Sequence, residues 1–118
     1  MDENVCWVLE LAVEPGRRED FSALMRDMVA AAGCERGTLN YEWSISSDGT
    51  VCHVYVRYLD SAAVMTHMRG FGDRFSSRFL ALAKITRMTV YGAPSAEVMH
   101  ALAPYGATYL APYGGFRR

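Results

Sequence analysis

Residues 5–14, with the sequence VCWVLELAVE, constrain the fold most, because they predict a strand whose two faces are both apolar. One face carries Val5, Trp7, Leu9, Leu11 and Val13, and the other carries Cys6, Val8 and Ala12. A strand with two apolar faces is normally covered on both. The sequence therefore predicts a sheet with helices on one face and a second covering layer on the other.

Residues 15–59 predict a helix followed by a β-hairpin. Pro15-Gly16 ends the first strand, and 17–33 has a helical apolar stripe that stops at Gly33. Residues 38–46 and 50–59 alternate as strands, and a Ser-Asp-Gly turn at 47–49 joins them.

Residues 60–118 predict a second helix, a fourth strand and a C-terminal appendage. Asp60 and Ser61 form a good N-cap pair for the helix. Gly70 and Gly72 each weaken its middle by ~1 kcal/mol relative to alanine, so we expect a break close to His67. A strand at 84–92, a short helix at 95–103 that Ser95 caps and Pro104 ends, and a short strand at about 107–111 follow.

The order β-α-β-β-α-β is that of the ferredoxin-like fold, an α+β class with an antiparallel sheet. We expect one domain over 1–118, with its core at about 5–92 and the appendage at about 93–118. In this topology the helices cover one sheet face, so the apolar side chains of the other face need a partner. The same face of a second copy is the simplest one, which predicts a homodimer.

Charge and composition exclude several classes of partner. The net charge is −1 and no Lys/Arg run exceeds two residues, so neither a nucleic acid nor a membrane surface is an expected partner. The start of the chain is acidic, without the apolar stretch of a signal peptide, and no window approaches a membrane helix. We therefore expect a cytoplasmic protein.

Cysteine and histidine spacing predicts neither a disulfide framework nor a metal site. Cys6, Cys34 and Cys52 are odd in number and widely spaced, and we expect them to be small buried hydrophobes. The three histidines are scattered, without HxH or HExxH spacing, and no glycine-rich phosphate motif is present. The sequence thus predicts no metal and no nucleotide cofactor.

The segments GTLNYEW, HVYVRYLDSAAVMTHM and ITRMTVYG, in this order, resemble the antibiotic biosynthesis monooxygenase superfamily over residues 5–92. The most specific piece runs from Tyr58 through Asp60 to His67. The resemblance implies a dimeric α+β barrel with a pocket between sheet and helices. It also implies oxidation of a phenol or quinol by O₂ without metal, haem or flavin. The superfamily is functionally mixed, so the fold does not fix the function.

Two positions depart from related proteins. Val56 stands where relatives often carry an acidic residue, which puts the usual proton-transfer pair in doubt. The first strand has no Asn, on which the haem-degrading branch relies, so that branch fits less well.

His67 is the strongest catalytic candidate, because it falls on the apolar face of its helix, one turn before Phe71. Partial desolvation favours a neutral imidazole, which can accept a phenolic proton at pH 7. The resulting phenolate is a far better electron donor to O₂ than the phenol. The alternative is a core histidine bonded to a backbone carbonyl.

A flat substrate needs aromatic walls. The candidates for this pocket are Tyr41, Trp43, Tyr55, Tyr58, Phe71 and Phe75, with Asn40 as a polar contact. Strand alternation places Tyr55 and Tyr58 on opposite faces, so these residues cannot all line one cavity. Asn40 and His53 could instead face solvent, and Arg57, Arg74 and Arg78 could stabilise an oxyanion or be solvated surface charges.

The leading hypothesis is a cofactor-independent monooxygenase acting on a small aromatic phenol or quinol. A non-redox isomerase or tautomerase using the same histidine is the second, and a non-catalytic module that binds a small molecule is the third. The sequence does not identify the substrate, and it does not exclude an unexpected haem or flavin.

Overall fold

The strand β1 (Val5–Val13) lies in the middle of the sheet, as its two apolar faces predict. In the computed structural model, which describes residues 2–118, β1 pairs antiparallel with β3 (Val51–Tyr58) and β4 (Ala83–Tyr91). β2 (Thr38–Ile45) pairs antiparallel with β3, and β5 (Thr108–Leu110) runs parallel to β4. The strand order is therefore β2-β3-β1-β4-β5.

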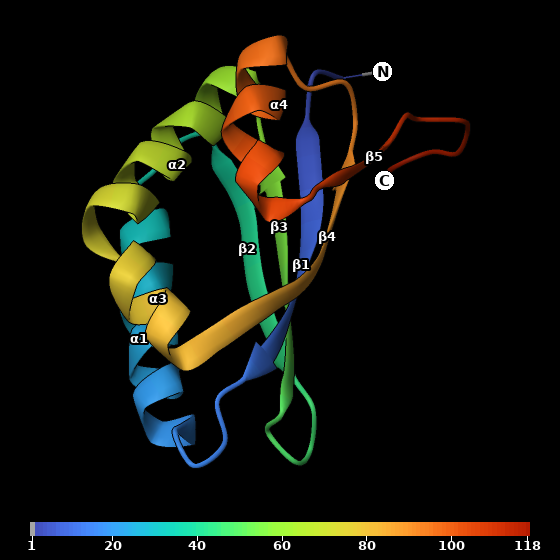
Figure 1. The fold of residues 1–118 in the computed structure, drawn as a ribbon. Coiled ribbons are helices and arrows are strands. Elements are labelled where there is room, and N and C mark those ends of the chain that lie inside the picture. The colour runs from blue at the N-terminus through green and yellow to red at the C-terminus, as the bar shows by residue number, and fades with distance from the viewer. Residues whose placement is uncertain (1) are drawn as a thin grey trace.

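The helices lie on one side of this sheet (Figure 1). They are α1 (Arg18–Ala32), α2 (Ser61–Arg74), α3 (Ser76–Leu82) and α4 (Ala96–Leu102), which a 3-10 turn, η1 (Ala103–Tyr105), extends. The order and the α+β class confirm the ferredoxin-like prediction. None of the described helices is long and apolar enough to cross a lipid bilayer.

The core lies between the helices and the inner face of the sheet. Val5, Trp7 and Leu11 of β1 and Val54, Val56 and Tyr58 of β3 are all buried in it. Phe21 and Leu24 of α1, Val64 of α2 and Phe79 of α3 cover them. Burying one such side chain stabilises the fold by about 1.5–3 kcal/mol.

The break in the second helical segment lies at Phe75, not at Gly70 and Gly72 as we expected. Both glycines remain helical, because a glycine lowers helix stability without preventing the helical conformation. Phe75 has φ −121°, so the chain changes direction there. The turn lets α3 place Phe79 and Leu82, which are 1% and 2% exposed, over the sheet.

Side-chain caps and one turn fix the ends of the elements as predicted. The N–H of Ala63 donates to Asp60 Oδ1 at 2.9 Å, and that of Val98 donates to Ser95 Oγ at 3.2 Å. Gly49 has φ +75° in the turn between β2 and β3, a conformation that glycine adopts readily.

The prediction that all three cysteines are buried is wrong for Cys34. Cys52 is buried on the inner face of β3, and Cys6 is half-buried on the outer face of β1. Cys34 follows the end of α1 and is exposed, because the chain leaves the core at that point. All three thiols are free.

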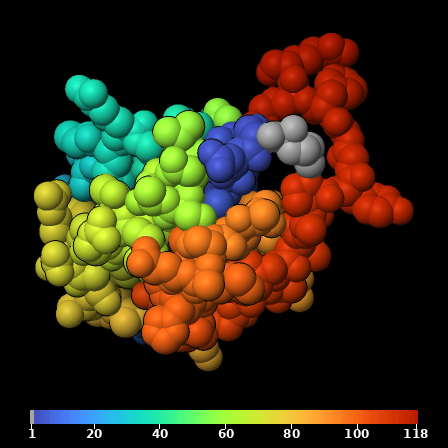
Figure 2. Space-filling model, turned by 90° about the horizontal axis from the view of Figure 1, so that it is seen from above, coloured from blue at the N-terminus to red at the C-terminus, as the bar shows by residue number. Residues whose placement is uncertain are grey.

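The outer face of the sheet is covered by none of the described helices (Figure 1). Its side chains are mixed: Cys6, Val8, Tyr55 and Tyr91 lie among Glu10, Glu42, His53, Arg57 and Arg87. The residues after β5 project beyond the body of the molecule (Figure 2). Their side chains Tyr113 and Phe116 are 106% and 81% exposed.

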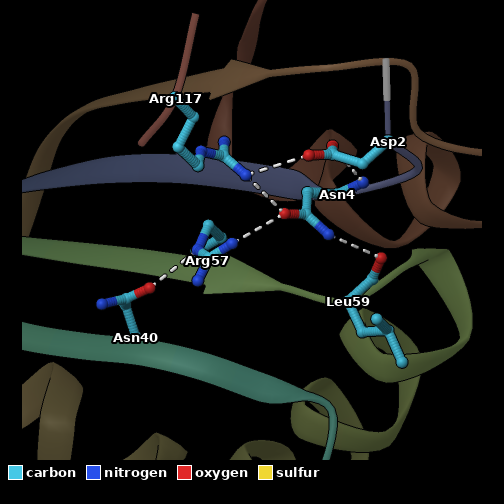
Figure 3. A network of polar contacts seen from close by, with 6 residues as sticks. All are labelled: Asp2, Asn4, Asn40, Arg57, Leu59 and Arg117. Carbon is cyan, nitrogen blue, oxygen red and sulfur yellow. Dashed lines mark hydrogen bonds and ion pairs between the residues drawn. The ribbon is translucent and has the colours of Figure 1, made fainter.

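Polar contacts tie this outer face to both ends of the chain (Figure 3). Arg57 donates to Asn40 Oδ1 at 2.7 Å and to Asn4 Oδ1 at 2.9 Å. Arg117 donates to Asn4 Oδ1 and to Asp2 Oδ2, each at 2.9 Å. The N-terminal and C-terminal segments therefore meet beside β1 and β3.

Candidate active site

His67 lies on the inner side of α2, is 9% exposed, and is held by a carboxylate. Its Nδ1 is 2.8 Å from Oε1 of Glu35, which comes from the loop between α1 and β2. The Thr38 hydroxyl donates to the same oxygen at 2.8 Å. The helix fixes the imidazole, and the loop brings the carboxylate to it.

The hydrogen-bond network assigns the protonation of this pair. Burial raises the pKa of Glu35, but the hydrogen bond and charge of His67, the bond from Thr38 and the charge of Arg74 outweigh it, so the net pKa lies below 4.5. Glu35 is thus an acceptor at neutral pH, and Nδ1 of His67 carries the proton that it accepts. Nε2 of His67 makes no hydrogen bond within residues 2–118, so it is the ring nitrogen left to meet a ligand.

Two tyrosine rings flank His67. The centroids of Tyr41 and Tyr58 lie 5.6 Å and 5.5 Å from that of the imidazole. Burial raises the pKa of both phenols above 10, so both hydroxyls are neutral at physiological pH. The rings restrict the imidazole without adding charge beside it.

An apolar cavity of about 50 Å³, here named the inner cavity, lies between the sheet and the helices. Aromatic and aliphatic side chains make most of its wall. They include Trp7, Tyr41, Trp43, Val56, Phe71, Phe79, Met88 and Tyr105, together with His67. The family resemblance implies a pocket between the sheet and the helices, and the inner cavity lies in that position.

A larger and more polar space, here named the outer hollow, lies between α1 and α2 and has a volume of about 330 Å³. Its wall includes Cys34, Glu35, Thr66, Gly70, Arg74 and Phe75. His67, Tyr41, Met28 and Phe71 line both spaces. His67 therefore lies between the apolar inner cavity and the more polar outer hollow.

The structure brings together five of the eight site residues that the sequence suggested. Tyr41, Trp43, Phe71 and Phe75 line one or both of the spaces that His67 lines. Tyr58 is fully buried behind the imidazole, where it packs on Trp7 with centroids 4.7 Å apart. Tyr58 thus supports His67 and is not part of either wall.

Tyr55 and Asn40 do not belong to this site, contrary to our expectation. Tyr55 pairs with Val8 and Glu42 on the outer face of the sheet, because it is one residue out of phase with the buried side chains of β3. Asn40 is on the same outer face, bonded to Arg57 (Figure 3).

The other polar candidates lie mostly outside the site as well. His53 is on the outer face with Nε2 3.6 Å from Glu10 Oε1, and Arg78 pairs with Asp27 at 2.7 Å. His100 is exposed on α4. Only Arg74 of the arginines that we considered lines one of the two spaces.

Glu35 is the residue beside His67 that sequence reasoning missed. It is 32 positions from His67, in a loop with no periodic pattern, so no spacing rule connects the two. The available signal was an acidic residue just before a strand that carries two pocket aromatics, Tyr41 and Trp43.

Two buried polar atoms have no hydrogen-bond partner within residues 2–118: Trp43 Nε1 and Tyr58 Oη. An unpaired buried donor costs about 1–3 kcal/mol, which a ligand oxygen can recover. The Trp43 ring lines the inner cavity, and its N–H lies close enough to the Tyr41 hydroxyl to oppose the burial that raises the pKa of that phenol. Among the same residues no group of three or more His, Cys, Asp or Glu side chains could hold a metal ion.

Residues 4–71, more than half of the chain and including Glu35 and His67, match the family model for antibiotic biosynthesis monooxygenase. The chain belongs to the antibiotic biosynthesis monooxygenase family. The part of the site from β1, β2, β3 and α2 as far as Phe71 thus lies within the matched residues, whereas Arg74, Phe75 and the residues of α3, β4 and η1 lie beyond them.

Solved structures share the fold. MupZ from Pseudomonas fluorescens is 21% identical with a TM-score of 0.86, over 99% of this chain and 96% of that one. Rv0793 from Mycobacterium tuberculosis is 26% identical with a TM-score of 0.63, over 78% and 95%. SnoaB, a cofactor-independent oxygenase from Streptomyces nogalater, is 16% identical with a TM-score of 0.66, over 79% and 95%. No curated protein matches the sequence.

Proposed function

We propose that this family member is a monooxygenase that oxidises a small phenol or quinol with O₂, without a bound cofactor, and that His67 is its general base. The observation that carries the proposal is the position of His67. Glu35 holds it at 2.8 Å, and it borders both the apolar inner cavity and the polar outer hollow. SnoaB, which has the same fold, supports the reaction class.

The first step is removal of the phenolic proton. Nε2 of His67 accepts it, and the Glu35 carboxylate stabilises the imidazolium that forms, as the carboxylate does in other carboxylate–histidine pairs. After this transfer, the positive imidazolium lies between two negative groups, the Glu35 carboxylate and the phenolate. Positioned base catalysis of this kind contributes about 10²–10⁴-fold to a rate.

The second step transfers electrons to O₂. The phenolate gives one electron to O₂, and the phenoxyl radical and superoxide combine to form a C–O bond. The imidazolium returns its proton to the peroxide, the ring carbon loses its hydrogen, and the O–O bond breaks with release of water. One oxygen atom ends as the new quinone carbonyl and the other as water, so a phenol and O₂ give a quinone and H₂O.

The walls fit a flat substrate that reaches from one space into the other. The inner cavity, at about 50 Å³, is smaller than the ~150 Å³ apolar cavity that holds a benzene molecule. The ring therefore extends past His67 toward the outer hollow, stacked on Tyr41 or Phe71. In this proposal the Trp43 N–H, which has no hydrogen-bond partner within residues 2–118, donates to a substrate oxygen.

A second candidate function is non-redox proton transfer, as in an isomerase or tautomerase. The Glu35–His67 pair favours it, because a carboxylate-oriented imidazole both accepts and returns a proton without needing O₂. The buried Val56 is consistent with either reaction: it places an apolar side chain, not a carboxylate, in the wall of the inner cavity.

The test is O₂ consumption in an oxygen electrode against a panel of hydroquinones and naphthols. His67→Ala should lower the rate at least hundredfold, and Glu35→Gln should lower it less. His100→Ala, an exposed histidine on α4, is the matched control and should keep the full rate. Product formed at an equal rate under argon would favour the isomerase, and binding without product would favour a non-catalytic module.

We propose further that the outer sheet face is the interface of a homodimer. Its half-buried apolar side chains Cys6 and Val8 and the exposed Tyr55 and Tyr91 lack a covering layer among the described residues. A second copy of the same face would cover them with a two-fold, self-complementary contact.

A further inference from the structure

The outer hollow exists because small side chains line it. Ala31 and Ala32 of α1 face Thr66 and Gly70 of α2 across it. A Cβ added at Gly70 would meet Glu35 Oε2 at 3.7 Å, so the missing side chain leaves the space directly above the carboxylate open. A larger side chain at this position would fill the hollow next to the Glu35–His67 pair.

Arg74 is the cationic side chain in the wall of this hollow. Within residues 2–118 it makes no hydrogen bond or ion pair, whereas its neighbour on the next helix, Arg78, is bonded to Asp27. His67 and Thr38 both bond Oε1 of the nearby Glu35 carboxylate, and Arg74 acts on that carboxylate through its charge alone, without a hydrogen bond. The guanidinium at Arg74 therefore remains available to an acidic group of a ligand.

The volumes of the two spaces indicate how a ligand divides between them. The inner cavity is apolar and, at about 50 Å³, too small for a whole aromatic ring. The outer hollow has about 330 Å³ and is lined by the charged side chains of Arg74 and Glu35. A ligand whose reacting ring reaches His67 must place the rest of its atoms in the outer hollow. Those atoms then lie against Arg74, beside the Glu35 carboxylate and apolar side chains such as Phe75.

We propose that the outer hollow is a binding site for a carboxylate group, so that the substrate is a phenol or quinol bearing an acidic side chain, which Arg74 recognises. This inference rests on the proposed function for the identity of the ring. The anion site itself is independent of whether the ring is oxidised.

The test measures binding separately from turnover. Affinities for 2,5-dihydroxyphenylacetate and for its neutral amide are measured by titration calorimetry under argon. We expect the acid to bind roughly fivefold more tightly, since a partly exposed ion pair contributes up to ~1 kcal/mol. Arg74→Gln should abolish that difference, and Arg69→Gln, an exposed arginine of α2 outside both spaces, should keep it.

A pair of glycine variants tests the location. Gly70→Leu fills the hollow and should weaken binding of the acid at least tenfold. Gly72→Leu removes a helical glycine from the same helix, but a Cβ there meets nothing within 4 Å, so binding should be unchanged. Both variants should retain the helix, since leucine has the higher helix propensity.

The outcomes distinguish this inference from the proposed function. Equal affinities for acid and amide, or an acid preference that survives Arg74→Gln, would overturn the carboxylate site. Arg74-dependent binding without O₂ consumption would retain the site and refute the oxygenase. Oxygen consumption at the same rate with the acid and the amide would support the oxygenase and refute the carboxylate site.

Discussion

The two faces of the sheet are formed by the same alternating strands but differ in their side chains and in what covers them. The inner face of β1 and β3 is apolar and packs under the helices, and the candidate site lies where His67 of α2 faces it. The outer face mixes apolar side chains with Glu10, His53 and Arg57, and its polar groups bond to each other. The comparison shows that the core and the candidate site share the inner face, while no described helix covers the outer face.

The largest expected effect is the loss of stability when the inner face is truncated. Leu11→Ala, at a position 1% exposed, should lower the free energy of unfolding by about 2–5 kcal/mol because it leaves a cavity. Val8→Ala on the outer face of the same strand should cost about 1 kcal/mol or less in the monomer. Urea unfolding of both variants at low protein concentration measures the difference. Equal losses would show that the two faces are equally packed.

Thiol reactivity sharpens the same comparison. Burial raises the pKa of Cys52, on the inner face, to about 11, so its thiolate is scarce at pH 8 and iodoacetamide cannot reach it. We expect the exposed Cys34 to react at least a hundredfold faster. Mass spectrometry of alkylated peptides over time follows each site. Fast labelling of Cys52 in the folded protein would contradict the packing of β3.

A charge on the outer face should separate the proposed dimer. Val8→Glu places a carboxylate in the middle of that face, next to Glu10, and should halve the mass measured by sedimentation velocity while the helical content is kept. Cys6, beside it, should then be alkylated faster than in the unmodified protein. A monomeric unmodified protein would refute the dimer outright.

The smallest expected effect is the pH dependence contributed by Glu35. Its pKa is lowered in the folded state, so its stabilisation is present above its unfolded value near 4.5 and is lost as the pH falls through the lower folded value. The side chain is partly exposed, so Glu35→Gln should cost about 0.5–1 kcal/mol at pH 6 and less below pH 4. Thermal unfolding of both proteins from pH 3 to pH 6 tests this. A difference that grows toward acid pH would reverse the assignment.

Much of the fold follows from local patterns in the sequence. The alternation in 5–13 and 38–45 and the caps at Asp60 and Ser95 depend on neighbours in the chain, and the structure has them where the sequence predicts. The break at Phe75 was misplaced, because it is set by how α3 packs on the sheet and not by the helix propensity of glycine.

The site was predicted less completely than the fold, for a related reason. His67 was found because a single helix face shows it among apolar residues. Glu35 was missed because its contact joins a loop to a helix, and Tyr55 was included because aromatic character alone does not reveal which face a strand residue occupies. Contacts between distant segments depend on the register of the strands. A shift of one residue in that register moves every side chain of a strand to the other face, and the sequence pattern alone does not fix it.

The contacts of Arg57 and Arg117 bear on whether the order of segments along the chain can be changed. Arg117 contacts Asp2 and Asn4, so residues near the two ends of the described chain lie side by side (Figure 3). A circular permutant, with a short linker joining these ends and new ends cut between Ser46 and Thr50, would keep every strand pairing. Its new ends would lie at the opposite end of β3 from Arg57, away from that network.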